Sequence, residues 1–199
     1  MKILAVSDVH ADQAFIKRLA AQAVKENVDL VVLAGDLTYA DQSAEGIIGP
    51  FKQAGKKVLF VHGNHESAAT GDFLAELYDS IHLNGTGIIH QGIGIFGAGG
   101  ASPGPFPTSA EDQYELLNQA HESVKSALRK VMVVHEHPAG TLLEKKSGYP
   151  GSWAVRKAVE KFQPEILFCG HVHELGGIEE MIGKTRVINV AKTPKIIQF

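Results

Sequence analysis

The chain of 199 residues has an ordinary globular composition, with 44% hydrophobic and 21% charged residues, which excludes a fibrous or largely disordered protein. The formal net charge of -3 counts against a dedicated nucleic-acid-binding protein, because such proteins carry an excess of basic residues. The single cysteine, Cys169, excludes an intramolecular disulfide and is consistent with a reducing compartment.

The length fits one domain over residues 1–199 better than two small ones, and no linker, repeat or low-complexity segment divides it. The apolar start of the chain is followed at once by Asp8 and His10, without a signal-peptide pattern. No run reaches the ~18 apolar residues expected of a membrane helix. We therefore expect a cytoplasmic protein without a membrane partner.

The first third of the chain alternates apolar runs with amphipathic stretches. Residues 2–7, 29–33 and 57–61 are typical of buried strands, and residues 12–26 and 42–54 are typical of helices between them. This strand-helix-strand-helix-strand order predicts an α/β fold.

The middle of the chain changes character. Residues 88–90 and 93–96 flank Gln91-Gly92 and predict a β-hairpin. Residues 97–109 are rich in glycine and proline and predict a long loop. Loops of this length in compact domains are often functional.

The last part of the chain resumes the α/β alternation. One helix is indicated by an apolar stripe: Tyr114, Leu117, His121, Val124 and Leu128. A further helix and five strands are predicted at residues 153–162 and at 131–134, 165–169, 178–182, 186–190 and 195–198, respectively. This number of strands implies two sheets.

A short polar motif follows each of five predicted strands. The motifs are Asp8-Val9-His10, Gly35-Asp36, Gly63-Asn64-His65, His135 and Gly170-His171-Val172-His173. Because the carboxyl ends of strands in α/β sheets meet at the edge where ligands bind, these residues can come together there. Their glycines permit sharp turns and close backbone approach.

The donor atoms of these motifs predict a metal centre. They come from two carboxylates, one amide and four imidazoles, without a thiolate: Asp8, Asp36, Asn64, His10, His135, His171 and His173. Mixed nitrogen and oxygen donors suit transition metals better than Ca or Mg. The set exceeds what one tetrahedral ion uses, so we expect two divalent transition-metal ions bridged by Asp36. Manganese is favoured, with Fe, Zn, Ni or Co as alternatives.

Two such ions carry more positive charge than Asp8, Asp36 and a bridging hydroxide remove, which favours an anionic substrate. Paired divalent ions suit displacement at phosphorus, because they activate water and neutralise charge on the phosphoryl oxygens. The expected activity is therefore hydrolysis of a small phosphoester by attack of a metal-bound hydroxide.

The ordered motifs resemble the calcineurin-like metallophosphoesterase superfamily, whose pattern is D-x-H, G-D, G-N-H-[DE], H and G-H-x-H. The resemblance implies an α/β fold, a four-layer αββα sandwich of two mixed β-sheets flanked by helices. It also implies an ion held by Asp8, His10 and His173, an ion held by Asn64, His135 and His171, and a bridging Asp36. His65 would then act on the leaving-group oxygen as a catalytic, substrate-binding group.

The sequence differs from the protein phosphatases of this family in two motifs, and these differences indicate which group of the family it resembles. Ala11 and residues 38–41 replace the glycine and the Asp-Arg-Gly run of those enzymes. The loop at residues 99–107 and the run His135-Glu136-His137-Pro138 look more similar to Icc-related phosphodiesterases and the brain-protein-239 group. This likeness favours a phosphodiesterase over a phosphatase.

Other conspicuous residues have weaker interpretations. His137 lies two residues beyond His135 and is a candidate for substrate binding, whereas His62 is either a substrate contact or a structural histidine. The remaining expectations are a core position for His121, surface or hairpin positions for His82 and His90, and buried packing positions for Cys169 and Trp153.

Two alternative functions remain open at the level of sequence. A metal-binding scaffold of the same fold would lack significant catalysis, and a nuclease would bind nucleic acid in a strongly salt-dependent way. The complete ligand set counts against the first alternative, and the acidic balance counts against the second. The sequence predicts no oligomeric state.

Overall fold

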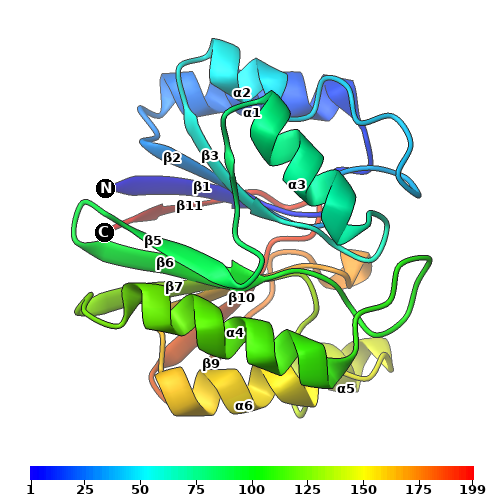
Figure 1. The fold of residues 1–199 in the computed structure, drawn as a ribbon, viewed down its shortest axis with the longest axis vertical. Coiled ribbons are helices and arrows are strands. Elements are labelled where there is room, and N and C mark those ends of the chain that lie inside the picture. The colour runs from blue at the N-terminus through cyan, green and yellow to red at the C-terminus, as the bar shows by residue number, and fades with distance from the viewer.

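The computed structural model describes residues 1–199 as two β-sheets that pack face to face, with helices on both outer faces (Figure 1). The first sheet is covered by α1 (Gln13–Lys25), α2 (Gly49–Gln53) and α3 (Ala68–Leu77), and the second by α4 (Ala110–Val124), α5 (Leu142–Ser147) and α6 (Trp153–Phe162). The expected four-layer sandwich is confirmed.

The first sheet has the order β11-β1-β2-β3-β4. Its strands are β1 (Lys2–Val6), β2 (Leu30–Ala34), β3 (Lys57–Val61), β4 (Ile81–His82) and β11 (Lys195–Gln198). Strands β1 to β4 are parallel, and β11 is antiparallel to β1. Every residue of β2 is buried, as expected for a central parallel strand covered on both faces.

The second sheet has the order β5-β6-β7-β8-β10-β9. Its strands are β5 (Thr86–His90), β6 (Ile93–Ala98), β7 (Arg129–Val134), β8 (Ile166–Cys169), β9 (Glu179–Ile182) and β10 (Thr185–Asn189). The four central strands are parallel and both edge strands are antiparallel, so both sheets are mixed. The predicted hairpin is confirmed, since His90 pairs with Ile93.

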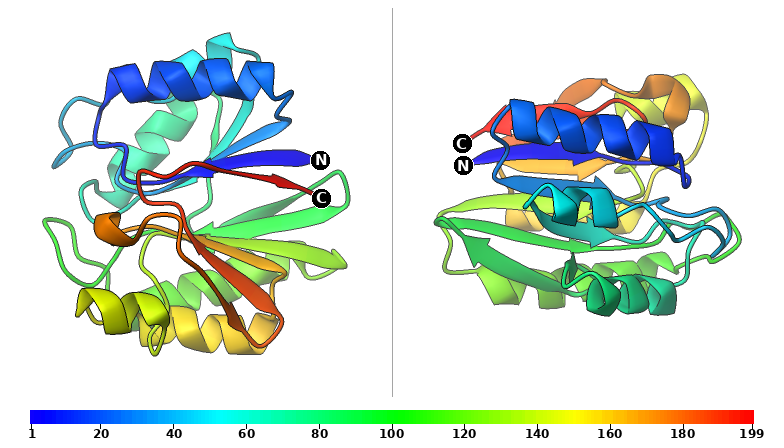
Figure 2. Two further views of the ribbon diagram at one scale, coloured as in Figure 1. Left: turned by 180° about the vertical axis from the view of Figure 1, so that it is seen from behind. Right: turned by 90° about the horizontal axis from the view of Figure 1, so that it is seen from above.

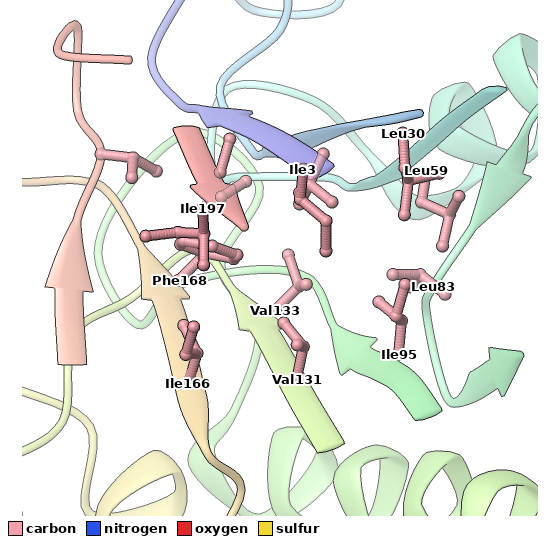
Figure 3. Packing of buried hydrophobic residues seen from close by; sticks show 14 of the residues in the cluster. Ile3, Leu30, Leu59, Leu83, Ile95, Val131, Val133, Ile166, Phe168 and Ile197 are labelled. Atoms are coloured by element: carbon pink, nitrogen blue, oxygen red, sulfur yellow. The ribbon is translucent and has the colours of Figure 1, made fainter. Parts of the chain in front are cut away.

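Apolar side chains from the two sheets meet in the middle of the sandwich (Figure 3). Ile3 and Leu59 point from the first sheet toward Val131, Val133 and Phe168 of the second. Burying a large apolar side chain contributes about 1.5–3 kcal/mol. This inner layer therefore holds the two sheets in register and fixes their strand ends relative to each other.

The two chain termini lie side by side at the amino end of β1 (Figure 2). Lys2 pairs with Gln198 in the antiparallel ladder between β1 and β11. Both termini are therefore at the end of the first sheet opposite the carboxyl ends of its parallel strands. No helix is both long and apolar enough to span a bilayer.

Two sequence-based expectations about helices are wrong. Of residues 42–54, only Gly49–Gln53 is helical, because Pro50 suits a first helical turn and the preceding chain has positive φ at Ser43 and Gly46. Leu128 does not belong to the buried stripe of α4. The helix ends at Val124, and Leu128 is 99% exposed.

Candidate metal centre

The five polar motifs meet at one end of the sandwich, where strands β1, β2, β3, β7 and β8 finish. Three of the residues that leave these strands have left-handed backbone conformations: Asp8 (φ 60°), Asp36 (φ 52°) and His171 (φ 70°). Non-glycine residues rarely adopt this region, and it is concentrated at functional sites. The sharp turns bring side chains from both sheets to a common centre.

Four side chains form a first group of possible metal ligands. One donor atom from each of Asp8, His10, Asp36 and His173 lies within 4.8 Å of the others. His173 Nε2 is 2.9 Å from Asp8 Oδ1 and 3.3 Å from His10 Nε2. His10 Nε2 is also 3.6 Å from Asp36 Oδ2.

A second group shares Asp36 with the first. Donor atoms of Asp36, His135 and His171 lie within 4.8 Å of one another. Asn64 completes this group, because its Oδ1 is 3.0 Å from His135 Nε2 and 3.1 Å from His171 Nδ1. All seven predicted ligands are thus brought together, while their assignment as ligands stays a prediction.

The imidazole orientations fit a metal. His135 Nδ1 donates to the carbonyl of Ala34 at 2.9 Å, and His10 Nδ1 lies 3.3 Å from the carbonyl of Thr38. A neutral ring that uses Nδ1–H in this way leaves the lone pair of Nε2 pointing to the centre. Several lone pairs therefore converge, an arrangement that a divalent cation stabilises.

The electrostatics of the centre also favour a cation. Burial alone would lower the pKa of His135, but the Asp36 carboxylate, reinforced by Asp8, raises it to about 10. Burial would raise the pKa of Asp36, yet His135 and His10 hold it well below its usual range. Burial, with His135 beside it, lowers the pKa of His171 to about 4. The carboxylates thus attract positive charge at His135, while the lowered pKa of His171 leaves its ring neutral and able to bind a cation.

Glycines permit the close approach of these segments. A Cβ atom on Gly63 would lie 2.0 Å from Asp36 Oδ1, and one on Gly170 would lie 2.5 Å from Asp8 Oδ2. Gly35 has φ +91° and packs directly against the ring of His135. These positions have no room for a side chain, as expected from the close backbone approach that the motifs require.

Glu66 is a supporting residue that the sequence did not identify clearly. Its buried carboxylate accepts backbone N–H groups of Leu37, Thr38 and Gly63 at 3.0, 3.2 and 2.9 Å. It therefore ties the turn that carries Asp36 to the turn that carries Asn64. The acidic residue after Gly63-Asn64-His65 was the only signal in the sequence.

A pocket of about 300 Å³ opens over the centre. It is lined by Asp36, Asn64, His65, Pro103, Gly104, Tyr149, His171, His173 and Glu174. His65 Nε2 is 4.0 Å from Asp36 Oδ2, while its Nδ1 is buried without a hydrogen-bond partner. The predicted long loop contributes Pro103 and Gly104, so it forms one wall of the pocket.

His137 does not line the pocket. The side chain is fully buried, and both ring nitrogens lack a partner. Its role in substrate binding stays a prediction.

Two other histidines, His82 and His121, differ from expectation, and His62 agrees with the structural alternative. His82 is buried rather than on the surface, and its Nε2 lies 3.0 Å from His62 Nδ1. His62 is buried as well and does not line the pocket. His121 stacks on Phe162 and is only half-buried.

The two expected packing positions have different outcomes. Cys169 is buried as expected, and burial raises the pKa of its thiol. Trp153 is not a core residue, because it is 45% exposed at the first position of α6 beside Tyr114.

Comparisons with known proteins agree with this fold and donor set. The family model described as calcineurin-like phosphoesterase matches residues 1–175. The uncharacterized protein MJ1162 of Methanocaldococcus jannaschii is 30% identical over 198 residues, which cover 95% of this chain and 87% of that protein.

Two solved structures share the fold. The structure of TT1561 from Thermus thermophilus superposes with a TM-score of 0.77 at 17% identity and covers 94% of this chain and 88% of its own. An archaeal phosphodiesterase gives a TM-score of 0.55 at 16% identity, with 95% and 82% covered, respectively.

Proposed function

Because this chain belongs to the calcineurin-like phosphoesterase family, we propose that it is a dinuclear metal-dependent hydrolase of small phosphoesters, with diesters favoured over monoesters. The observation that carries the proposal is that two groups of possible ligands share Asp36. A shared carboxylate is the arrangement that places two ions side by side.

The ligands divide into two triads around this carboxylate. Asp8, His10 and His173 would hold one ion, and Asn64, His135 and His171 the other. The donors are imidazole, carboxylate and amide, which supports a transition metal and favours manganese in our proposal. When bound, the ions would supply a nucleophilic water at neutral pH and positive charge for the phosphoryl oxygens.

His65 is proposed as the group that acts on the leaving-group oxygen. It lines the pocket, and its imidazole Nε2 lies 4.0 Å from Asp36 Oδ2, so the ring stands beside the two ligand groups and belongs to neither. Its backbone is fixed, because its N–H donates to Asp36 Oδ1 at 3.1 Å and its carbonyl accepts from Asp41 N at 3.0 Å. A held imidazole can donate a proton to the departing oxygen.

The dimensions of the pocket support a small substrate. A volume of about 300 Å³ is at the low end for ligand sites, and most of the residues that line it are polar. The phosphoryl group would lie beside Asp36, Asn64 and His171, which line the pocket and belong to the groups of candidate ligands. The preference for diesters rests on the similarity of the loop at residues 99–107 and of the run His135-Glu136-His137-Pro138 to Icc-related phosphodiesterases.

Turnover tests the proposal. Hydrolysis of bis(p-nitrophenyl) phosphate and of p-nitrophenyl phosphate is measured with added Mn²⁺ in the wild type, in Asp36→Asn and in Asp79→Asn, whose side chain is fully exposed. We expect turnover in the wild type and in Asp79→Asn, with the diester preferred, and a loss of at least a hundredfold in Asp36→Asn. Equal turnover in Asp36→Asn would overturn the proposal. Metal binding without any turnover would favour a scaffold.

A further inference from the structure

A chain of hydrogen bonds connects the surface of α3 to a buried histidine near the metal centre. Asp72 Oδ1 is 2.8 Å from His82 Nδ1, and His82 Nε2 is 3.0 Å from His62 Nδ1. The side chain of Asp72 is 77% exposed, whereas His82 and His62 are 8% and 4% exposed. The chain therefore runs from solvent to a position two residues before Asn64.

The direction of the two hydrogen bonds follows from the chemistry of the groups. An ionised carboxylate only accepts, so His82 Nδ1 carries the hydrogen that faces Asp72. Burial favours the neutral imidazole, and the Nε2 of a neutral His82 is then an acceptor. His62 must therefore donate its Nδ1–H to His82. An exposed carboxylate thus determines the tautomer and the orientation of a buried ring.

Residues of α3 and of the long loop fit closely around these rings. A Cβ atom on Gly71 would lie 2.5 Å from His82 Cε1, and one on Gly99 would lie 2.2 Å from His62 Nδ1. The amide of Gly100 donates to the carbonyl of His62 at 2.9 Å. The first residues of the loop at 99–109 therefore rest directly on His62, and a rotated His62 ring would displace them.

The same loop reaches the metal centre a few residues later. The amide of Phe106 donates to the carbonyl of Asn64 at 3.1 Å, and a Cβ atom on Gly104 would lie 2.2 Å from Asn64 Nδ2. Pro103 and Gly104 line the pocket. The position of the loop thus sets one wall of the pocket and restrains the Asn64 side chain.

We propose that Asp72 is a positioning residue for this site: through His82 it fixes the ring of His62 and with it the loop at residues 99–109 that walls the pocket. The kinetic consequence of this proposal rests on the proposed function, whereas the coupling from Asp72 to the loop does not. Asp72 touches no substrate and no ligand, and acts only through the two rings.

The variants Asp72→Ala and Asp72→Asn separate this role from a general structural one. Asparagine keeps an oxygen that accepts from His82 Nδ1–H, so it preserves the direction of the chain, whereas alanine removes the acceptor. Glu76→Ala is a matched control, because Glu76 is an exposed acidic residue on the same helix. All three changes are at exposed side chains and leave the packed core intact.

The first readout is the tautomer of His62, measured by ¹⁵N NMR of the imidazoles at constant pH. We expect the Nδ1–H form in the wild type, Asp72→Asn and Glu76→Ala, and a mixture of forms in Asp72→Ala. The amide resonances of Gly99, Gly100 and Gly104 should shift in Asp72→Ala and stay in place in the other variants. An unchanged tautomer, or loop resonances that move no more than in Glu76→Ala, would overturn the proposal.

The second readout is kinetic. In Asp72→Ala we expect KM for bis(p-nitrophenyl) phosphate to rise about three- to tenfold with kcat within about twofold of wild type, and Asp72→Asn to restore KM. Unchanged KM in a protein whose loop resonances have shifted contradicts the role in positioning substrate. If the wild type itself has no turnover, the proposed function fails, and the NMR result still decides whether Asp72 controls the loop.

Discussion

His135 Nε2 faces Asn64 Oδ1 at 3.0 Å, although 71 residues separate the two in the chain. Because His135 Nδ1 already donates to Ala34, a neutral ring directs a lone pair at the amide oxygen. Two acceptors at this distance repel each other unless a cation or a proton lies between them. The protein therefore needs positive charge at this point.

Metal removal should lower thermal stability. An ion that binds only the folded state at a hundred times its Kd stabilises it by about 2.7 kcal/mol. In a chain of this size each kcal/mol corresponds to roughly 2–4 °C. We expect chelation to lower the Tm by about 5–10 °C and added Mn²⁺ to restore it, as followed by circular dichroism. A Tm that does not respond to chelator or metal contradicts a metal centre within the core of the fold.

The metal-free protein should lose stability as pH rises from about 6.5 to 10. The pKa of His135 in the folded state is about 10, raised by Asp36 against the effect of burial, while the unfolded value is near 6.5. A raised folded pKa contributes stability that is complete below pH 6.5 and is lost as pH approaches 10.

The measurement is urea denaturation across this pH range with and without Mn²⁺. The decline should be present in the metal-free protein and largely absent in the metal-loaded one, where His135 would bind the ion through Nε2 and that nitrogen would hold no proton. Identical pH profiles for the two forms would show that His135 does not exchange its proton for a metal.

Glu66→Gln should weaken both the fold and the metal centre. The carboxylate of Glu66 accepts from the amides of Leu37, Thr38 and Gly63, and a glutamine amide offers one acceptor oxygen with two donors in place of the other. Leaving buried amides unpaired costs about 1–3 kcal/mol.

Loss of a hydrogen bond that supports metal ligands without touching the ion typically reduces metal affinity about 10- to 100-fold. Urea denaturation measures the first effect and calorimetric Mn²⁺ titration the second. Glu76→Gln on the exposed face of α3 serves as the control. Wild-type Mn²⁺ affinity in Glu66→Gln argues against a role for this residue in holding the two turns together.

His65→Ala should separate catalysis from metal binding. Loss of a general acid typically costs 10²- to 10⁴-fold in rate, and His65 stands outside both ligand groups. We expect kcat to fall by about that factor while Mn²⁺ content stays at the wild-type level. A substrate with a better leaving group should recover part of the loss. If metal content falls together with kcat, His65 belongs to the ligand set instead.

Much of the fold follows from local pattern. Strand β3 and helix α6 have the predicted bounds, because continuous apolar runs and a strong amphipathic stripe leave few alternatives. The structure of residues 42–54 is harder to predict. Their apolar spacing suits a helix, but left-handed turns that depend on surrounding contacts interrupt it. Leu128 shows the same limit, because a stripe cannot indicate where a helix ends.

The convergence of the seven candidate side chains could be predicted because strand ends meet by topology, while their role as ligands stays a prediction. The contacts that hold these side chains in place could not be predicted in the same way. The contact of Glu66 with the Asp36 turn, and the pairing of His62 with His82, link segments whose relation depends on the packing of α3 and the long loop. His82 has no surrounding motif in the sequence, so its burial is visible only in three dimensions.

The number of bound ions and the magnetic coupling between them test the proposed dinuclear centre most directly. Protein reconstituted with Mn²⁺ is freed of excess metal, and its Mn²⁺ content is measured by inductively coupled plasma mass spectrometry. Its electron paramagnetic resonance spectrum is then recorded. We predict two Mn²⁺ per chain with an exchange-coupled spectrum, and loss of both features in Asp36→Asn, because Asp36 is shared by the two ligand groups. One ion per chain with the spectrum of isolated Mn²⁺ in the wild type would contradict a dinuclear centre.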